Sequence, residues 1–309
     1  MKKILLIDTF NFIHRAYHAL PKTLTSQDGH PINAVYGVTS MLLNIFDAVT
    51  PDYVVAAVDS RKPTFRLEEF SGYKAHRRPI DDELSEQIPL VFDVLSSFGI
   101  SQISADGYEA DDVIGTISTK MSADSNSETI IASNDRDLWQ LVRKNVLVVL
   151  PATKGVPEWL GPKEVTARLG FEPSLLVDFK GLRGDPSDNI PGVYGVGEKT
   201  AKTLIEKYKS VEELYKNIDF VTPESLRNKL LESYEQAIMS KRLARIITDA
   251  PIEFNLKETI YQGYDKQTLT QLLQKYNFKS LLKRIGHEGS RDFNDGLGSS
   301  SRIMQKSLF

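Results

Sequence analysis

Acidic residues stand at the ends of the apolar runs in the first half of this sequence. Asp8 closes the run KKILLID, Asp59 follows YVVAAV, and SNDRD follows TIIA. A further motif, YEADDVIGT, stands where a loop leads into a predicted helix, and GDPSDN follows in the second half. The acids of these motifs are Asp8, Asp59, Glu109, Asp111, Asp112, Asp135, Asp137, Asp185 and Asp188.

These acids are expected to meet in space and to need cations. The carboxyl ends of parallel strands share one edge of a sheet, and carboxylates gathered there repel one another unless cations neutralise them. Oxygen ligands with no histidine or cysteine among them favour Mg²⁺ or Mn²⁺ over zinc. Two such ions about 4 Å apart support in-line attack on a phosphodiester. The acidic motifs therefore predict a phosphodiester-cleaving metal centre.

A structural alternative applies to each acid taken singly. An aspartate after a strand often caps a helix or forms a turn, and Asp112 in particular suits a helix cap. Four strand-end motifs together with GDPSDN in one chain make separate caps the less favoured interpretation.

A glycine-rich segment and a basic run suggest contact with nucleic acid. IPGVYGVGEKTA places Gly192, Gly195 and Gly197 directly before a predicted helix. Glycine allows close backbone approach, and free N–H groups at a helix start bind phosphate, although a simple tight turn is the alternative. From Arg61 to Arg78 basic residues alternate with Phe65 and Tyr73. Such a run is usually a solvated face, but it also suits a channel for single-stranded nucleic acid.

The elements that must position these residues change character along the chain. KKILLID, YVVAAVD, ETIIAS and VLVVL predict strands, separated by amphipathic helical stretches. This alternation predicts an α/β core over 1–172, with a largely parallel sheet covered on both faces. Beyond it, EKTAKTLIEKY, PESLRNKLLESYEQAIMSKRLARI and KQTLTQLLQKYNF predict a helical region over 173–286. The Gly- and Ser-rich stretch 287–309 predicts a flexible tail.

Composition narrows the class of protein. The chain of 309 residues is 41% hydrophobic and 26% charged, which is typical of a soluble protein with room for two domains. It has no cysteine, which excludes disulfides and thiolate metal sites. No apolar run suits a signal peptide or a membrane span, so a cytoplasmic protein without membrane contact is expected. The net charge of −3 decides nothing about nucleic acid, because binding depends on how charge is distributed.

Together these motifs resemble the 5′-nuclease domain of bacterial DNA polymerase I and, more distantly, phage and eukaryotic flap endonucleases. The resemblance covers roughly 1–286 and rests on LLIDTFNFIHRAYHA, Asp59 with TFR, GYKAHR, YEADDVIGT, SNDRD and GDPSDNIPGVYGVGEKTA. It implies a three-layer PIN-like or resolvase-like core, a helical arch over about 71–98 and a helix-hairpin-helix in the second region.

The resemblance also implies the metal sites. A first site would use Asp8, Asp59, Glu109 and Asp111; a second would use Asp135, Asp137, Asp185 and Asp188; Asp112 would support both. Mg²⁺ is the implied metal, with Mn²⁺ as a substitute, and K⁺ is implied at the carbonyls of the hairpin. One departure is that the family's small-Gly-Asp motif reads Ser133-Asn134-Asp135 here. Because asparagine tolerates left-handed backbone, we expect the geometry of Asp135 to be kept.

The same resemblance implies roles for basic and aromatic residues. Lys74 and Arg77 would reach the scissile phosphate and stabilise its developing charge, and Tyr73 would stack on the terminal base. Further DNA contacts are implied at Arg15, Arg66, Arg78, Gly192, Gly195, Gly197, Lys199 and Lys202, with His14 a weaker candidate. The hairpin would grip the duplex backbone without reading sequence. Trp139 and Trp159 are assigned to packing.

The final five residues carry a separate signal. Gln305-Lys306-Ser307-Leu308-Phe309 resembles the peptide by which bacterial replication proteins bind the sliding clamp. In that interpretation Gln305 anchors the peptide, and Leu308 and Phe309 fill an apolar pocket. A chance match is the alternative.

The expected function is that of a monomeric 5′→3′ exonuclease and 5′-flap endonuclease. Its substrates would be DNA flaps, nicks and 5′ ends in primer removal and repair. Whether it also cuts RNA primers is left open. A PIN-type ribonuclease is disfavoured by the helix-hairpin-helix and GDPSDN. A catalytically silent junction-binding module is disfavoured by the complete set of acids. The sequence does not decide between a stand-alone enzyme and a fragment of a polymerase.

Overall fold

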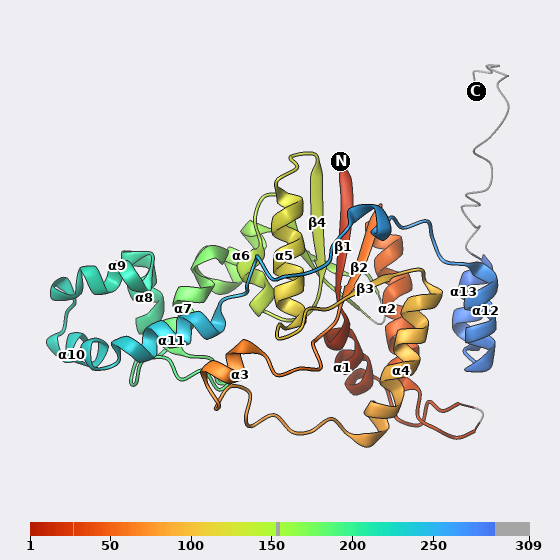
Figure 1. Ribbon diagram of the computed structural model, residues 1–309, viewed down its shortest axis with the longest axis horizontal. Helices are drawn as coiled ribbons and strands as arrows, with labels where there is room; N and C mark the ends of the chain where they lie inside the picture. The colour runs from red at the N-terminus through yellow and green to blue at the C-terminus, as the bar shows by residue number, and fades with distance from the viewer. Residues whose placement is uncertain (27, 153–154, 288–309) are drawn as a thin grey trace, which may run out of the picture.

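Within residues 1–26, 28–152 and 155–287, which this computed structural model describes, six strands form one sheet (Figure 1). They are β1 (Lys2–Asp8), β2 (Tyr53–Ala57), β3 (Ser101–Ile103), β4 (Ser127–Ala132), β5 (Val146–Leu150) and β6 (Glu158–Leu160). Their order is β3-β2-β1-β4-β5-β6, with β6 antiparallel to β5 and all other neighbours parallel. The structure confirms the predicted mostly parallel sheet. It adds β3 and β6, whose three residues each are too few to form a recognisable apolar run.

Helices cover both faces of the sheet. Successive residues of the central strand point to opposite sides and are apolar, so both faces are buried. Leu5 and Ile7 of β1 pack in one core with α1 (Thr9–Ala19), α2 (Asn33–Val49) and α4 (Asp82–Ser97). Ile4 and Leu6 pack in the other core with α5 (Ala110–Ser122), α6 (Pro162–Leu169) and the 3₁₀ helix η1 (Asp137–Leu141). All four side chains are at most 1% exposed. An uninterrupted apolar run is typical of a parallel strand buried on both faces.

A helical region extends from one end of the sheet (Figure 1). It contains α7 (Leu176–Arg183), α8 (Glu198–Tyr208), α9 (Val211–Lys216), α10 (Glu224–Glu232) and α11 (Tyr234–Ala244), with the 3₁₀ turns η2 (Pro173–Leu175) and η3 (Ile218–Phe220). The helix expected from PESLRNKLLESYEQAIMSKRLARI is interrupted: Ser233 separates α10 from α11. The helical character predicted from Pro173 onward is confirmed.

The helical region ends earlier than the predicted 286. After α11 the chain crosses back over the core through η4 (Leu256–Thr259), and Tyr261 donates its N–H to the Asp52 carbonyl at 2.8 Å. The last helices, α12 (Lys266–Lys275) and α13 (Lys279–His287), then pack beside α2 and α4 at the opposite end of the molecule (Figure 1). An amphipathic pattern shows that a helix has an apolar face but not which body covers it, so periodicity alone could not place this pair.

The crossing segment lies very close to α5. A Cβ on Gly115 would lie 2.5 Å from Ile246 Cγ2 and 2.7 Å from the Ile247 carbonyl oxygen, so only glycine fits there without a shift. The segment is therefore packed against the helix whose first turn carries YEADDVIGT. Across the described ranges, no helix is both long enough and apolar enough to cross a bilayer.

The predicted helical arch over about 71–98 is helical only in its second part. Residues 71–76 form turns, 77–81 have no regular structure, and α4 begins at Asp82. Helix α4 belongs to the core, since Leu84, Val91 and Leu95 are buried. The irregular part is the segment 71–81, which follows the short helix α3 (Phe65–Glu69) and is exposed from residue 75 onward.

Candidate metal and nucleic-acid site

The strand ends bring the predicted acids to one edge of the sheet. Asp8 ends β1 and caps α1, accepting the Asn11 N–H at 3.1 Å. Its other oxygen accepts the Ser133 hydroxyl at 2.7 Å, which joins the ends of β1 and β4. Asp59 follows β2 and accepts the Ala110 N–H at 2.7 Å, which joins this strand to the start of α5. Hydrogen bonds thus join four of the acidic motifs in two pairs, Asp8 with SNDRD and Asp59 with YEADDVIGT.

The first turn of α5 carries three acids with different surroundings. Glu109 and Asp112 form a capping box, in which the Glu109 N–H donates to Asp112 Oδ2 at 3.1 Å. Asp111 stands between them and experiences the charges of Asp135, Asp8 and Glu109. The capping alternative considered for Asp112 is therefore confirmed, while Asp111 faces the other acids.

Four of the nine acids have no basic partner in the described part of the chain. These unpaired acids are Asp8, Asp59, Asp111 and Asp135. Burial, reinforced by the charges of Asp135 and Asp59, raises the pKa of Asp8 to about 7. Burial and the same kind of repulsion raise the pKa of Asp111 well above its ordinary value, and burial raises that of Asp59. At neutral pH these carboxylates are charged only at a cost, which a nearby cation would remove.

The other five acids, which we call the paired acids, already have cations from the protein. They are Glu109 with Lys74 and Arg66, Asp112 with Arg66, Asp137 and Asp185 with Lys180, and Asp188 with Arg77 and Lys74. Within the described residues, no three His, Asp or Glu side chains are already arranged to ligate one ion. The division of the acids into two metal sites therefore stays a prediction.

Two predicted site residues form a buried ion pair instead. Arg66 is 2% exposed and Asp112 is fully buried. The guanidinium binds both oxygens of Asp112 at 2.7 Å and also donates to the carbonyls of Leu243 and Arg245 at 2.9 and 2.8 Å. Arg66 is therefore not a DNA contact, and Asp112 is not open to a metal ion. The buried pair contradicts the DNA contact predicted for Arg66, because a residue's place in a motif does not show which partner neutralises its charge, whereas the supporting role of Asp112 stays a prediction.

The stacking role predicted for Tyr73 is also wrong in this structure. Its ring is 4% exposed, and its hydroxyl donates to Glu109 and Asp188, at 3.2 Å in each case. Tyr73 thus anchors the segment 71–81 beneath the acids rather than offering a ring to a base.

Lys74 and Arg77 lie where the segment 71–81 meets the acids. The Lys74 ammonium is 2.9 Å from Glu109 Oε1, and the Arg77 guanidinium is 2.6 Å from Asp188 Oδ1. Two backbone contacts fix the segment: the Lys74 N–H donates to the Asp188 carbonyl at 2.9 Å, and the Asn189 side chain donates to the Gly72 carbonyl at 2.7 Å. Both Lys74 and Asn189 have positive φ, at 54° and 57°, which is rare outside glycine and is often found at functional sites.

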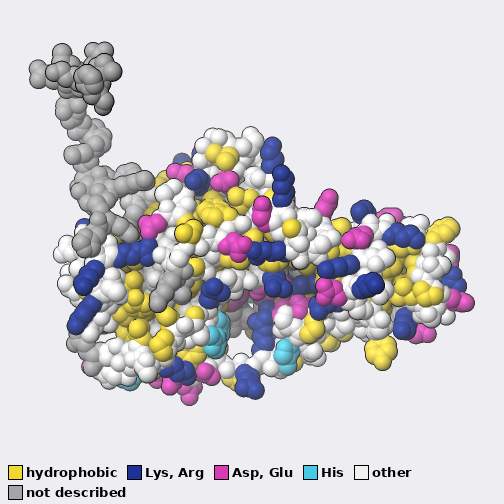
Figure 2. All heavy atoms as spheres, turned by 180° about the vertical axis from the view of Figure 1, so that it is seen from behind, with side chains coloured by type: hydrophobic (Ala, Val, Ile, Leu, Met, Phe, Trp, Pro, Cys, Tyr) yellow, Lys and Arg dark blue, Asp and Glu magenta, His cyan; other side chains and the backbone are white. Residues whose placement is uncertain are grey.

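Figure 2 shows an opening near the lower edge of the molecule, with Lys, Arg and His side chains around it and acidic side chains above. The segment 71–81 contains the exposed residues His76, Arg77 and Arg78. On α1, Arg15 is exposed and His14 is half-buried, and nearby Arg77 contributes to lowering the pKa of His14 after the larger effect of burial. The basic groups predicted for DNA contact therefore include three that solvent reaches: Arg15, Arg77 and Arg78.

The glycine hairpin precedes α8 as predicted. Gly192 and Gly195 have φ of 63° and 76°, and a Cβ on Gly192 would lie 2.1 Å from the Gly184 nitrogen. Helix α11 holds Gly192 at both polar groups: its N–H donates to Ser240 Oγ at 3.0 Å, and its carbonyl accepts from Gln236. Gly197 has φ of −85° and caps α8, so its role does not depend on left-handed backbone. Lys199 is exposed, whereas Lys202 pairs with Glu198 at 3.0 Å.

Asn134 does not use the conformation expected of it, since it is absent from the non-glycine residues with positive φ. The position of Asp135 is instead set by hydrogen bonds: the Asn134 N–H donates to Asn11 Oδ1 at 2.9 Å, and the Asp135 N–H donates to Ser133 Oγ at 2.9 Å. Trp139 packs in one core and Trp159 against the other, in agreement with the packing assignment.

The sequence analysis did not single out Lys180, and it named Ser133 only as part of the altered motif before Asp135. Lys180 is 7% exposed and contacts both Asp137 and Asp185, while Ser133 is fully buried and binds Asp8. A lysine in a helix and a serine in a loop are too common to be signals by themselves. Their position next to GDPSDN and SNDRD is the only hint that the sequence contains.

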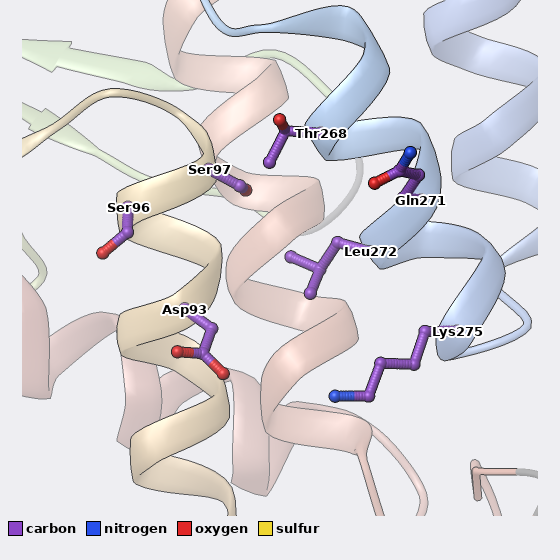
Figure 3. Close-up of a pocket in the computed structure, with 7 residues that line it drawn as sticks. All are labelled: Asp93, Ser96, Ser97, Thr268, Gln271, Leu272 and Lys275. Atoms are coloured by element: carbon purple, nitrogen blue, oxygen red, sulfur yellow. The ribbon is translucent and has the colours of Figure 1, made fainter.

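A hollow of about 440 Å³ lies elsewhere, between α4 and α12 (Figure 3). Asp93 and Lys275 line it from opposite sides, together with Ser96, Ser97, Thr268, Gln271 and Leu272. None of the predicted site residues contributes to it. The clamp-binding residues predicted in the tail, Gln305, Leu308 and Phe309, lie outside the described residues.

Comparisons with known proteins agree with this geometry. A family model described as the 5′-3′ exonuclease N-terminal resolvase-like domain matches residues 3–170, and one described as the 5′-3′ exonuclease C-terminal SAM fold matches 171–267. DNA polymerase I of Bacillus subtilis is 39% identical over 296 residues, which is 95% of this chain and 33% of that protein. DNA polymerase I of Thermus filiformis is 40% identical over 92% of this chain and 33% of that protein. The chain thus spans about one third of these relatives.

Solved structures share the fold at low sequence identity. The 5′-exonuclease of phage T5 with bound zinc ions has a TM-score of 0.66 and 18% identity, covering 90% of this chain and 99% of that one. The catalytic core of Rad2 in complex with a DNA substrate has a TM-score of 0.56 and 15% identity, covering 92% of each chain. These likenesses support a resolvase-like core joined to a helical region.

Proposed function

This chain belongs to the 5′-3′ exonuclease family, and we propose that it hydrolyses DNA phosphodiesters as a 5′→3′ exonuclease and 5′-flap endonuclease. The observation that carries the proposal is the group of four unpaired acids at the strand ends. Hydrogen bonds join Asp8 to Ser133 after β4 and Asp59 to the start of α5, although burial and mutual repulsion make the charged forms of Asp8 and Asp111 costly. An arrangement that costs free energy without a cation is typical of a metal centre.

The chemistry of the donors fits a hard divalent ion. Carboxylate oxygens alone suit Mg²⁺, with Mn²⁺ as a substitute. Asp8, Asp59, Glu109 and Asp111 would hold a first ion, and Asp135, Asp137, Asp185 and Asp188 would contribute to a second. When bound, such ions polarise the scissile phosphodiester and make the attacking water more acidic. The phage T5 enzyme is recorded with divalent metal ions, which supports the same requirement here.

The chain's own cations would stabilise the reacting phosphate. Burial alone would lower the pKa of Lys74, but Glu109 and Asp188 raise it on balance, so the ammonium stays charged. Its side chain is 24% exposed and that of Arg77 is 54% exposed, so both remain accessible from solvent. We propose that a phosphate replaces Glu109 and Asp188 as the partner of these two groups, which places positive charge where negative charge develops.

The preferred substrate is proposed to be DNA with a 5′ flap, nick or 5′ end. The opening beside the segment 71–81 suits a single strand, and the hairpin at 192–197 suits the duplex backbone through exposed Lys199. Arg15 and Arg78 are exposed cations on the same path. A K⁺ ion at the hairpin carbonyls and cleavage of RNA primers are extensions of this proposal.

The biological setting follows from the family. We propose roles in primer removal and repair, with a 5′-phosphate left on the product and a monomeric enzyme. The sequence Gln305-Lys306-Ser307-Leu308-Phe309 supports recruitment by a sliding clamp. Titration of this tail peptide against the clamp tests it: binding lost on Leu308→Ala with Phe309→Ala supports recruitment, and no binding at high micromolar concentration rejects it.

The central experiment is cleavage of a labelled 5′-flap duplex with Mg²⁺ and with a chelator. We expect cleavage near the junction only with the metal, and none of a covalently closed circular duplex, which has no 5′ end. Binding without cleavage at any metal concentration would favour a silent junction-binding module. Preferential cleavage of structured RNA would favour a PIN-type ribonuclease.

A further inference from the structure

One ammonium group lies between two of the predicted metal ligands. Lys180 Nζ contacts Asp137 Oδ1 and Asp185 Oδ2. Lys180 is 7% exposed, and the side chains of Asp137 and Asp185 are 20% and 9% exposed. The three groups therefore form a nearly enclosed cluster with two negative charges and one positive charge.

The local fold explains why the cluster forms. Lys180 lies on α7, whose neighbours Phe179 and Leu182 are buried, so the helix cannot rotate to carry the lysine to solvent. Five residues later, after Gly184 with φ of 79°, Asp185 faces back toward the lysine. Asp137 comes from the other body, at the start of η1 beyond β4. The cluster thus joins the helical region to the core.

The same contacts leave little room for a divalent ion on this pair. Asp185 Oδ1 accepts the Ser187 N–H at 2.9 Å and the Ser187 hydroxyl at 2.6 Å, while Oδ2 is taken by Lys180. Asp137 Oδ1 is also taken by Lys180. Among the hydrogen bonds of the described residues, Asp137 Oδ2 is the one oxygen of this pair without a partner. An ion that used both carboxylates would have to compete with the ammonium.

We propose that Lys180 is a built-in counter-ion of the Asp137–Asp185 pair, and that the second divalent ion binds there only by displacing it. This rests on the proposed two-metal function and deepens it. Lys180 then sets the order of loading, because the unpaired acids bind an ion without competition and the Asp137–Asp185 pair does so only at higher metal concentration. A lysine suits this task, because its single charge on a flexible stem can withdraw more easily than a bidentate guanidinium.

The test is Mn²⁺ binding to the metal-free full chain without DNA, measured by titration calorimetry. Lys180→Met keeps the length of the side chain and removes the charge, and we expect its weaker site to tighten by about tenfold or more, as loss of a competing charge nearby implies. Lys180→Arg keeps the charge in a form that is harder to displace, and we expect its weaker site to become weaker still. In both variants the tighter site should keep its affinity.

Lys241→Met is a matched control, because Lys241 is also buried and bridges two acids, Asp178 and Glu212, neither of which is a predicted metal ligand. It should destabilise the fold without tightening any Mn²⁺ site. Thermal melting at increasing Mn²⁺ gives a second readout. The metal should raise the melting temperature of Lys180→Met more than that of the unchanged protein.

The outcomes separate the two proposals. If the unchanged chain binds two ions and neither Lys180 variant shifts the weaker site, Lys180 is a structural ion pair and this inference is wrong. An equal gain in Lys241→Met would also overturn it. If the unchanged chain binds fewer than two ions at saturating Mn²⁺, the two-metal proposal itself fails.

Discussion

The unpaired acids and the paired acids share one edge of the sheet but differ in how their charge is neutralised. Asp8, Asp59 and Asp135 accept hydrogen bonds from neutral donors, and burial and repulsion raise the pKa of Asp8 and Asp111. Glu109, Asp112, Asp137, Asp185 and Asp188 each contact a lysine or an arginine. The charges of the first group need a cation from solvent to neutralise them, while those of the second group are largely neutralised by the protein itself. Position in a motif therefore does not make acids equivalent, and each prediction below tests this difference.

The largest expected effect separates one acid from each group. Asp111→Asn removes a negative charge that no lysine or arginine pairs with, so its loss acts on the bound metal ion. We expect the rate of single-turnover cleavage to fall by about 10³-fold or more, because a metal contact contributes several kcal/mol. Asp137→Asn leaves Lys180 with Asp185 and should lose less. Affinity for the flap duplex should stay within about threefold in both variants, as measured with a chelator present. Equal losses in cleavage would show that the two groups do not differ in function.

The Arg66–Asp112 pair should matter for folding more than for chemistry. Arg66→Met leaves a fully buried carboxylate without its partner, and we expect a loss of about 3 kcal/mol in the free energy of unfolding. Arg66→Met combined with Asp112→Leu should recover part of that loss, since neither charge then remains. Urea denaturation measures both. A single variant as stable as the parent would mean that the pair is not the structural link that its contacts indicate.

Lys74 tests whether a paired cation is released to the substrate. If it turns from Glu109 to a phosphate, Lys74→Ala should reduce the single-turnover rate by about a hundredfold and change affinity little. Lys62→Ala is the control, because Lys62 is exposed and pairs with Asp106 away from the acids. A Lys74 effect seen only in affinity would make it a channel residue.

The metal-free protein should be less stable at neutral than at acidic pH because of Asp8. Its pKa rises from 3.8 to about 7 on folding, so the folded state binds the proton more tightly. The resulting stability is present below about pH 4 and is lost as the pH rises through about 7. Relative to Asp8→Asn, we expect the parent to lose about 3 kcal/mol between pH 4 and pH 7, and Mg²⁺ to restore it. Parallel stability curves for the two proteins would contradict the raised pKa.

The smallest predicted effect concerns Asn189, which fixes the segment 71–81. Asn189→Ala loses the hydrogen bond to Gly72 and places alanine at φ of 57°, and we expect about a fivefold slower single turnover. Asn189→Gly loses only the hydrogen bond and should be less affected. If glycine and alanine behave alike, the backbone conformation contributes nothing to the position of Lys74.

The sequence predicted the scaffold and the location of the site better than its internal pairing. Apolar strands ending in Asp8 and Asp59 are local patterns, and parallel topology brings such ends together. The partner of a charge is a property of tertiary structure: nothing near Arg66 in sequence indicates that Asp112 neutralises it. Lys180 was missed, and Tyr73 was assigned to a base, for the same reason. The placement of α12 and α13 on the core likewise depends on which surfaces remain uncovered after the rest has folded.

The route of the chain after α11 has a mechanical consequence. The helical region leaves the core before α7 and re-enters it at the Ile246–Ile247 contact with Gly115, so the polypeptide connects it to the core at two points rather than one. The Arg66 guanidinium holds the carbonyls of Leu243 and Arg245 at the return point. A region connected to the core at two points cannot rotate freely about either one. The distance between the hairpin and the acids is therefore fixed. DNA that binds the hairpin and is cut at the acids, as proposed, would have to match this fixed distance.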